Sequence, residues 1–342
     1  MSFSIRPGVR EKIGLLFGVA GASGSGKTRS ALHLAKGMAN GVGRVAVVDT
    51  EAGRALHYAP KPGDAADSAK GTFDFLHLDF GPPFTPERYI EAIRACEEAG
   101  ATVIVLDSMS HEWAGEGGCS DIQSVEAERL ATYNGVLNPN RVEAVTAPAW
   151  KKPKLRHTRM MARLIQCRTH LIFCLRAQEK IKIIKRTDGK PGTEIVPIGF
   201  QPICEKSFPF ELSGSLMMHP DAPGCPDYGL PKKLNDELQS ILPHGKRVDD
   251  EAGRHLREWA ESGGDRKEED KAAAGARDLI ERIQDIPGLG ALRALTAEPD
   301  VMKKLAYLRK NRADLAADVD AALATALALY EAADEAAQDD AA

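Results

Sequence analysis

The chain has 342 residues and the composition of a globular protein, with 43% apolar residues, 27% charged residues and a net charge of −4. This length is enough for one large α/β core with a smaller unit appended to it. No apolar run reaches the roughly 18 residues of a membrane span, and the N-terminal segment lacks the apolar core of a signal peptide. Six cysteines without a C-x-x-C pair favour reduced thiols. We therefore expect a cytoplasmic protein that does not enter a membrane.

A glycine-rich loop follows the first predicted strand, residues 13–21. From Gly21 to Thr28 the sequence fits the pattern G-x-x-x-x-G-K-[ST], and a helix-forming run comes next. In this context the N–H groups of the loop and the helix N-terminus bind phosphates, Lys27 reaches the β- and γ-phosphates, and the Thr28 hydroxyl holds Mg²⁺. The predicted phosphate-binding residues are Gly21, Ala22, Ser23, Gly24, Ser25, Gly26, Lys27 and Thr28. The sequence therefore predicts a site for a nucleoside triphosphate.

Further strands and helices alternate along the chain. Arg44–Asp49 and Thr102–Asp107 are short apolar runs typical of buried parallel strands, and residues 73–80 alternate weakly. Thr85 and Pro86 predict the start of a helix. This alternation favours a mostly parallel sheet with helices on both faces.

Several side chains are candidates for the chemistry of hydrolysis. Asp107 ends an apolar strand in the manner of a Walker B aspartate, which contacts Mg²⁺ directly or through water. Glu51 follows the second strand, and because the carboxyl ends of parallel strands lie beside the phosphates, we favour it as the base that activates a water. Glu112, further along the chain, is the alternative base. Arg176, after the strand 171–175, is a candidate sensor of the γ-phosphate. The predicted catalytic residues are Lys27, Glu51, Asp107 and Arg176, and the predicted metal ligands are Thr28 and Asp107.

The middle of the chain is strongly basic. Residues 109–150 lack a sustained period and predict a long loop, which is followed by a helix over 155–168 and a hairpin over 181–196 that turns at Asp188-Gly189. The segment 141–190 has fourteen Lys/Arg and three acidic residues, a charge of +11 that leaves −15 on the rest of the chain. Such a belt favours a polyanionic partner, whereas pairing with acids elsewhere in the fold is the other explanation.

The residues beyond position 260 predict a second unit. We expect a first domain over residues 1–260 and a charged, glycine-bearing linker over 261–275. Apolar residues then recur at three- and four-residue spacing, which predicts a small helical domain over 276–334. Residues 335–342 are predicted to form an acidic tail.

Three blocks of this sequence resemble a known family. Residues 18–35, 47–59 and 103–118 contain the phosphate loop, Glu51 and Asp107. They look like the RecA-type ATPase core and, more narrowly, like phage and prophage ATPases of the AAA-domain class, which includes RecA-like single-strand annealing recombinases. The resemblance extends over roughly residues 10–260 and implies a RecA-like P-loop core with a mostly parallel sheet. Together with the C-terminal helices, this gives an α/β protein with a small helical domain as the predicted fold class.

The resemblance also carries implications for the site. It implies ATP and Mg²⁺ as cofactors, Glu51 as the water-activating carboxylate, and loops that face single-stranded DNA after Asp107 and after Leu175. The predicted nucleic-acid contacts are Lys151, Lys152, Lys154, Arg156, Arg159, Lys180, Lys182, Lys185 and Arg186. The candidates to stack on bases are Trp113, Trp150 and His157. One departure is that RecA has a glutamine after its fourth strand, where this chain has Arg176 with Gln178 two residues on.

These observations lead to one favoured function and two alternatives. The favoured function is a DNA-stimulated ATPase of phage type that acts on single-stranded DNA in annealing or strand exchange. Such a protein is expected to assemble as a ring or filament of identical subunits in the cytoplasm, of the host if phage-encoded, and to bind a phage or host replication protein through its C-terminal helices. The alternatives are a nucleotide-switched phage assembly scaffold and a P-loop small-molecule kinase. The sequence leaves open whether the bound strand is DNA or RNA, and whether the protein anneals strands or exchanges them.

Overall fold

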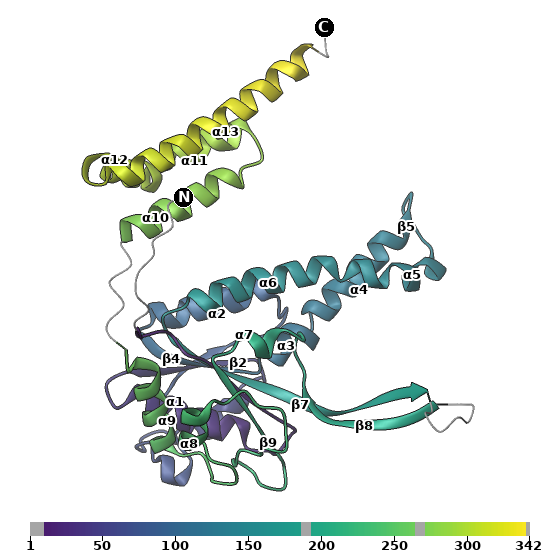
Figure 1. Ribbon diagram of the computed structural model, residues 1–342, viewed down its shortest axis with the longest axis vertical. Coiled ribbons are helices and arrows are strands. Elements are labelled where there is room, and N and C mark those ends of the chain that lie inside the picture. Colours follow the sequence, from purple (N-terminus) through teal and green to yellow (C-terminus); the bar gives the residue numbers. More distant parts are fainter. Residues whose placement is uncertain (1–9, 186–192, 264–270, 340–342) are drawn as a thin grey trace. The chain divides into compact units, whose positions relative to one another are not determined.

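The computed structural model describes residues 10–185, 193–263 and 271–339 (Figure 1). Its contacts divide the chain into two compact units, Met1–Gly264 and Asp265–Ala342. The first unit contains the sheet and the second is built from helices. The expected turn at Asp188-Gly189, residues 264–270 of the expected linker and the last residues of the expected acidic tail lie outside the described residues.

The first unit is built on a parallel sheet with the strand order β3-β2-β4-β7-β1-β9. Its strands are β1 (Leu16–Gly21), β2 (Arg44–Asp49), β3 (Leu76–Asp79), β4 (Ala101–Asp107), β7 (His170–Lys185), β8 (Thr193–Pro202) and β9 (Gly214–Met218). All neighbours along this order are parallel, and β8 alone pairs antiparallel, with β7. Strand β7 lies between β1 and β4, so the glycine-rich loop and Asp107 extend from strands that are not neighbours. The α/β class with a mostly parallel sheet is confirmed.

Helices cover both faces of this sheet (Figure 1). The helices of the first unit are α1 (Lys27–Ala39), α2 (Pro86–Glu98), α3 (Ser110–Ala114), α4 (Cys119–Ala131), α5 (Pro139–Ala149), α6 (Lys151–Gln166), α7 (Phe208–Glu211), α8 (Asp236–Ile241) and α9 (Asp250–Glu261), with short 3-10 turns at Arg54–Tyr58 and Ser68–Lys70. Phe17 and Val19 of β1 pack in one core with α1, α8 and α9, whereas Leu16 and Ala20 pack in the other with α2 and α6. Because both faces are buried, these strands are continuous apolar runs in the sequence.

Residues 109–150 are largely helical, where the sequence predicted a loop, and together with α6 they form a helical arm. Helices α4 and α5 are joined by the two-residue strands β5 (Thr132–Tyr133) and β6 (Val136–Leu137), and α4 and α5 both pack against α6 (Figure 1). The turn between the strands is Asn134-Gly135, with φ values of 48° and 77°, which is typical of a two-residue hairpin. The prediction was wrong because α5 buries only Ala149 and the buried face of α4 is made of small and polar residues, so neither helix has the wide apolar stripe that identifies a helix in a sequence.

The strand β7 extends beyond the sheet as a two-stranded ribbon with β8 (Figure 1). Its first residues, from His170 to Cys174, pair with β4, and the residues from Ala177 to Lys185 pair with β8 instead. The ribbon corresponds to the expected hairpin over 181–196 and is longer at both ends, since it pairs from Ala177 to Pro202.

The second unit is a helical domain with its own core. Its helices are α10 (Lys271–Gln284), α11 (Leu289–Ala297), α12 (Pro299–Asn311) and α13 (Ala313–Asp339). Leu279, Val301 and Val319 are among the buried residues that hold these helices together. Within the part of the chain that the structure describes, no helix is long and apolar enough to cross a membrane.

Candidate functional site

The glycine-rich loop joins the end of β1 to the start of α1. Gly24 and Gly26 have φ values of 79° and 84°, a region that L side chains rarely adopt. A Cβ atom on Gly26 would lie 2.7 Å from the backbone nitrogen of Gly224. That nitrogen donates a hydrogen bond to the Ser25 carbonyl oxygen at 2.9 Å. The glycine at position 26 is therefore required both by backbone conformation and by the close approach of a neighbouring segment.

The polar side chains of the loop suit a phosphate with a divalent cation. Thr28 Oγ1 donates to Asp107 Oδ2 at 2.6 Å, and Lys27 Nζ donates to the Ala22 carbonyl oxygen at 3.0 Å. Ser25 is buried, and its hydroxyl has no hydrogen-bond partner in the described structure. A hydroxyl and a carboxylate are ligands that Mg²⁺ prefers, and an unpartnered buried hydroxyl marks a place for a further polar group. The residues present therefore fit Mg²⁺ with a triphosphate.

Asp107 is almost fully buried at the end of β4, with 5% of its surface exposed. Burial raises the pKa of its carboxyl from 3.8 to about 6, and the nearby charges of Glu51 and Asp49 act in the same direction. The hydrogen bond from Thr28 and the charge of Lys27 oppose this shift. A bound cation would offset the cost of holding this carboxylate charged away from water.

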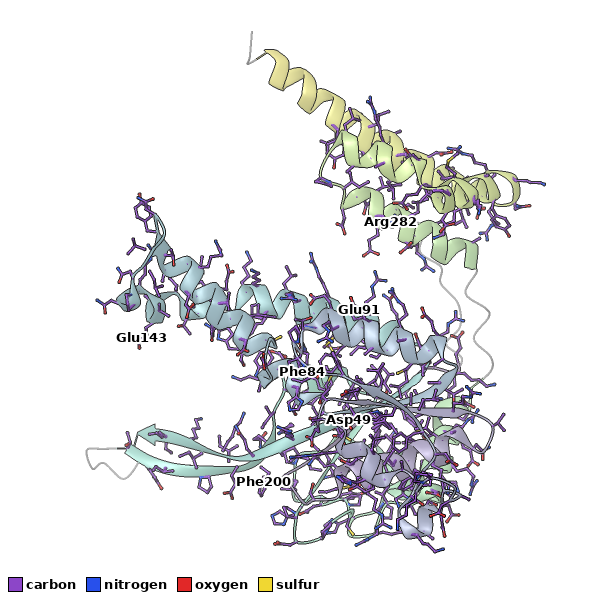
Figure 2. The ribbon with its side chains drawn as sticks, turned by 180° about the vertical axis from the view of Figure 1, so that it is seen from behind. Asp49, Phe84, Glu91, Glu143, Phe200 and Arg282 are labelled. Carbon is purple, nitrogen blue, oxygen red and sulfur yellow. The ribbon has the colours of Figure 1, made fainter. Side chains whose placement is uncertain are left out.

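The turn after β2 positions Glu51. Asp49, labelled in Figure 2, accepts hydrogen bonds from the backbone nitrogens of Glu51 at 2.7 Å and Ala55 at 2.9 Å. Thr50 Oγ1 accepts from the Ser108 nitrogen at 2.6 Å and lies 2.7 Å from His111 Nδ1. These bonds fix the ends of β2 and β4 to one another and orient the Glu51 side chain.

Glu51, just after β2, forms an ion pair with Arg176, which lies where β7 leaves the parallel sheet. Nε and a terminal nitrogen of Arg176 donate to Glu51 Oε1 at 2.9 and 2.7 Å, and Arg54 donates to Oε2 at 3.3 Å. Burial alone would raise the pKa of Glu51, but the hydrogen bond and charge of Arg176, with Arg54, lower it below its ordinary value. Glu51 is therefore an ionised carboxylate at neutral pH.

Glu112 occupies a different environment. It is buried at the root of the arm, where its Oε1 accepts from His157 Nδ1 at 3.0 Å and from the Cys119 sulfur at 3.2 Å. These contacts join α3 to α4 and α6. Of the two candidate bases, Glu51 is thus the one at the strand ends that surround the phosphate loop.

Two functional features escaped the sequence interpretation. Asp49 was taken only as the last residue of a strand, yet it anchors the turn that presents Glu51. His111 reaches Thr50 across the site. An aspartate two residues before a candidate base is a local signal of such a turn, since its side chain hydrogen-bonds the backbone two residues on, whereas the His111 contact has no local signal.

The predicted nucleic-acid contacts divide into two groups. Lys152 pairs with Glu126 at 3.1 Å, and Arg156 pairs with Glu87. The members without an acidic partner in the described structure are Lys151, Lys154, Arg159, Lys180 and Lys182, all of which are exposed. Lys185 is the last described residue of β7, and Arg186 lies outside the described residues.

The three predicted stacking residues are engaged within the protein. Trp113 and Trp150 stack on one another, with ring centroids 5.0 Å apart and an angle of 14° between the planes. His157 is buried against Glu112. The His157 ring is therefore enclosed, whereas Trp113 and Trp150 are half-buried and each has one face against the other.

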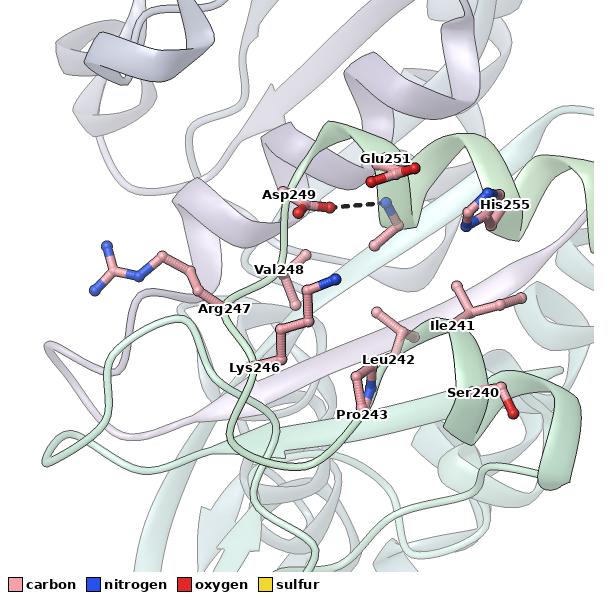
Figure 3. Close-up of a pocket in the computed structure, with 11 residues that line it drawn as sticks. Ser240, Ile241, Leu242, Pro243, Lys246, Arg247, Val248, Asp249, Glu251 and His255 are labelled. Atoms are coloured by element: carbon pink, nitrogen blue, oxygen red, sulfur yellow. Dashed lines mark hydrogen bonds between the residues drawn. The ribbon is translucent and has the colours of Figure 1, made fainter.

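A separate cavity of about 210 Å³ lies between α8 and the start of α9 (Figure 3). Asp249, on its wall, accepts a hydrogen bond from the Ala252 nitrogen at 2.9 Å and so caps α9. Val248, also on the wall, donates through its nitrogen to the Gly224 carbonyl oxygen at 2.9 Å. None of the predicted site residues lines this cavity.

The fold and the loop at Gly21–Thr28 define a P-loop nucleotide-binding protein of the α/β class. Residues 14–199, more than half of the chain, match the family model described as an AAA domain, and the chain belongs to this family. The matched residues include the phosphate loop, Glu51, Asp107 and Arg176. Among solved structures, the chain is similar to the RadB recombinase, with 16% sequence identity, a TM-score of 0.33, and coverage of 71% of this chain and 90% of that chain. No curated protein matches the sequence.

Proposed function

We propose that the protein is a phage-type ATPase that binds ATP and Mg²⁺ at Gly21–Thr28 and acts on single-stranded DNA in annealing or strand exchange. The observation that carries the ATPase proposal is the meeting of residues from four strands at one edge of the sheet. The phosphate loop, Glu51 and Asp107 lie at the carboxyl ends of β1, β2 and β4, and Arg176 lies beside them where β7 leaves the parallel sheet. Ligands of open α/β sheets bind at this edge.

Each side chain has a role in this proposal. Lys27, which contacts its own loop in the present structure, turns to the β- and γ-phosphates, and Thr28 and Asp107 hold the metal. Mg²⁺ bound there supplies positive charge to the phosphate oxygens. Glu51 orients a water and accepts its proton as the water oxygen bonds the γ-phosphorus and the bond to the β-phosphate oxygen breaks. Arg176 keeps Glu51 ionised and carries a second positive charge to the γ-phosphate.

The nucleic-acid proposal is supported by the exposed cations of the arm and the ribbon. Lys151, Lys154 and Arg159 lie on α6, and Lys180 and Lys182 lie on β7. Such side chains bind phosphates and release counterions, so affinity for a strand is expected to fall steeply with salt. We further propose that identical subunits assemble, with the ribbon lysines as candidates to reach a neighbouring subunit, and that the helices of the second unit bind a replication protein.

The test is a comparison of the wild type with Lys27→Ala and with Lys61→Ala, an exposed lysine outside the site, as the matched control. ATP binding is measured by titration with Mg²⁺-ATP, and hydrolysis by released phosphate. We expect turnover by the wild type and Lys61→Ala and none by Lys27→Ala, because the charge that binds the transferring phosphate is gone. Binding without turnover by the wild type would favour the scaffold, and phosphate transfer to an added small molecule would favour the kinase. Either result would overturn the proposal.

A further inference from the structure

An exposed phenylalanine stands between the arm and the ribbon. Phe210, on the short helix α7, has 76% of its surface exposed. Two residues earlier, Phe208 is fully buried, with its ring centroid 5.3 Å from that of Phe173 and 6.2 Å from that of His157. Figure 1 shows α7 between α6 and the β7–β8 ribbon. The turn is therefore anchored in the core by one aromatic ring and presents a second ring to solvent.

The backbone beneath Phe210 is held in place. Lys233 Nζ donates to the carbonyl oxygens of Phe210 at 2.7 Å and Leu212 at 2.6 Å. The Phe210 nitrogen donates to the Ser207 carbonyl oxygen at 2.9 Å, and the nitrogen and hydroxyl of Ser207 both donate to the Glu205 carboxylate. A ring on a fixed backbone loses little conformational freedom when it binds, which favours a recognition role over an accidental exposure.

Positive charges from three segments surround this turn. The Ile203 nitrogen donates to the Arg176 carbonyl oxygen at 2.7 Å, which places the start of the turn at the root of the ribbon, where Lys180 lies. Lys206 is exposed within the turn itself, and Lys154 lies on α6 one helical turn before His157, whose ring packs near Phe208 at the start of α7. The acids nearby are Glu205 and the exposed Glu211.

The electrostatics of the buried groups agree with this placement. Burial raises the pKa of Glu205, but the hydrogen bonds from Ser207 and the charges of His157 and Lys154 lower it more, so it lies below its ordinary value. Burial, with Glu205 and Glu112, raises the pKa of the Cys204 thiol to about 12, while the charge of Lys180 acts in the opposite direction.

We propose that Phe210 is a stacking platform for a base of a single strand whose phosphates contact Lys154, Lys180 and Lys206. An aromatic face accepts any base, and cations at its sides hold the backbone that carries the base. This inference rests on the proposed action on single-stranded DNA and assigns a base contact beyond the predicted residues Trp113, Trp150 and His157.

The test measures the affinity of the full chain for a dT oligomer over a salt series. Phe210→Ala is expected to weaken binding by about tenfold, in the range for one base–aromatic stack, without changing the slope of affinity against salt. Lys154→Ala is expected to reduce that slope. Phe210→Trp is expected to keep the affinity of the wild type, because a larger aromatic ring takes the same place. The matched control is Tyr307→Ala, which removes an exposed aromatic ring of the second unit and is expected to leave the affinity for the oligomer unchanged. An oligomer that is abasic at every position is bound equally by the wild type and Phe210→Ala.

The outcomes separate this inference from the proposal on which it rests. If the wild type retains no strand at low salt, the proposed function fails. If the wild type binds but Phe210→Ala binds equally well at an unchanged melting temperature, the stacking inference is overturned while the proposed function stands. If Phe210→Ala instead changes the mass of the assembly at unchanged affinity for the strand, Phe210 is a protein contact and the inference is likewise overturned.

Discussion

Replacing Asp107 with Asn is expected to stabilise the nucleotide-free protein while removing its activity. Burial raises the pKa of Asp107 from 3.8 to about 6, so the folded state binds a proton more tightly here than the unfolded state does. The free energy of unfolding therefore falls as pH rises from about 4 to 6, and above pH 6 the cost is about 3 kcal/mol, at about 1.4 kcal/mol per pKa unit. Asparagine avoids this cost because it does not ionise, and it retains an oxygen that can accept the hydrogen bond from Thr28.

The assay is thermal unfolding of the wild type and Asp107→Asn without nucleotide, at pH 7.5 and at pH 4.5. At about 2–4 °C per kcal/mol for a unit of this size, the variant is expected to unfold roughly 6–12 °C higher at pH 7.5. The difference at pH 4.5 is expected to be much smaller. Asp64→Asn, at an exposed position, is the control and shows no such difference. Hydrolysis by Asp107→Asn is expected to be lost because a metal ligand is weakened. A variant that melts no higher than the wild type at pH 7.5, or whose advantage persists at pH 4.5, would refute the reasoning.

Three further predictions concern the same edge of the sheet. Glu51→Gln is expected to bind ATP but to slow turnover by about 10²–10⁴-fold, as for loss of a general base. Glu112→Gln is expected to keep its turnover and to lower the free energy of unfolding by about 1–3 kcal/mol, because a buried acceptor of two hydrogen bonds is weakened. The reverse pattern in phosphate-release and denaturation assays would identify Glu112 as the base. Arg176→Ala raises the pKa of Glu51 and moves the acid limb of the kcat/KM profile to higher pH, and an unmoved limb would show that Arg176 does not control that carboxyl. Gly26→Ala abolishes nucleotide binding in a titration, because its Cβ would lie 2.7 Å from the Gly224 nitrogen; wild-type affinity would contradict this.

The phosphate loop could be predicted from the sequence because its determinants are local. The glycines at positions 24 and 26 are required by backbone angles within the loop itself, and a short pattern records them. The side of the sheet on which Glu51 and Asp107 lie also followed from the sequence, since each ends an apolar run and parallel strands share the direction of their ends.

The contacts that define the chemistry could not be predicted in the same way. Arg176 and Glu51 are 125 positions apart, and their meeting depends on β7, β4 and β2 being consecutive in the sheet, an order that no local pattern encodes. The partners of Lys152 and Arg156 are likewise set by tertiary packing. The count of basic residues therefore gives the net charge of the segment 141–190. It could not show which of these side chains form ion pairs within the protein.

The arm shows a limit of periodicity as a signal. Helix α5 buries a single residue, and two of the five residues that α4 buries are polar, so neither helix has an apolar stripe in its sequence. Pro148 inside α5 is a further signal against a helix. Phe210 is the opposite case, because an apolar side chain is expected to be buried. Phe208, two residues earlier, is buried, and only the structure shows that Phe210 is exposed.

The measurement that tests the central claim most directly is ATP turnover with and without a dT oligomer over a salt series. The wild type is compared with a triple variant in which Lys151, Lys154 and Arg159 are replaced by Glu, and with a control that carries the same charge change outside the arm, at the exposed residues Lys61, Lys303 and Lys310. We predict that the strand raises turnover by the wild type and the control at low salt, that this gain declines as salt rises, and that the triple variant shows no gain. A wild-type rate that is the same with and without the strand at every salt concentration would contradict the account.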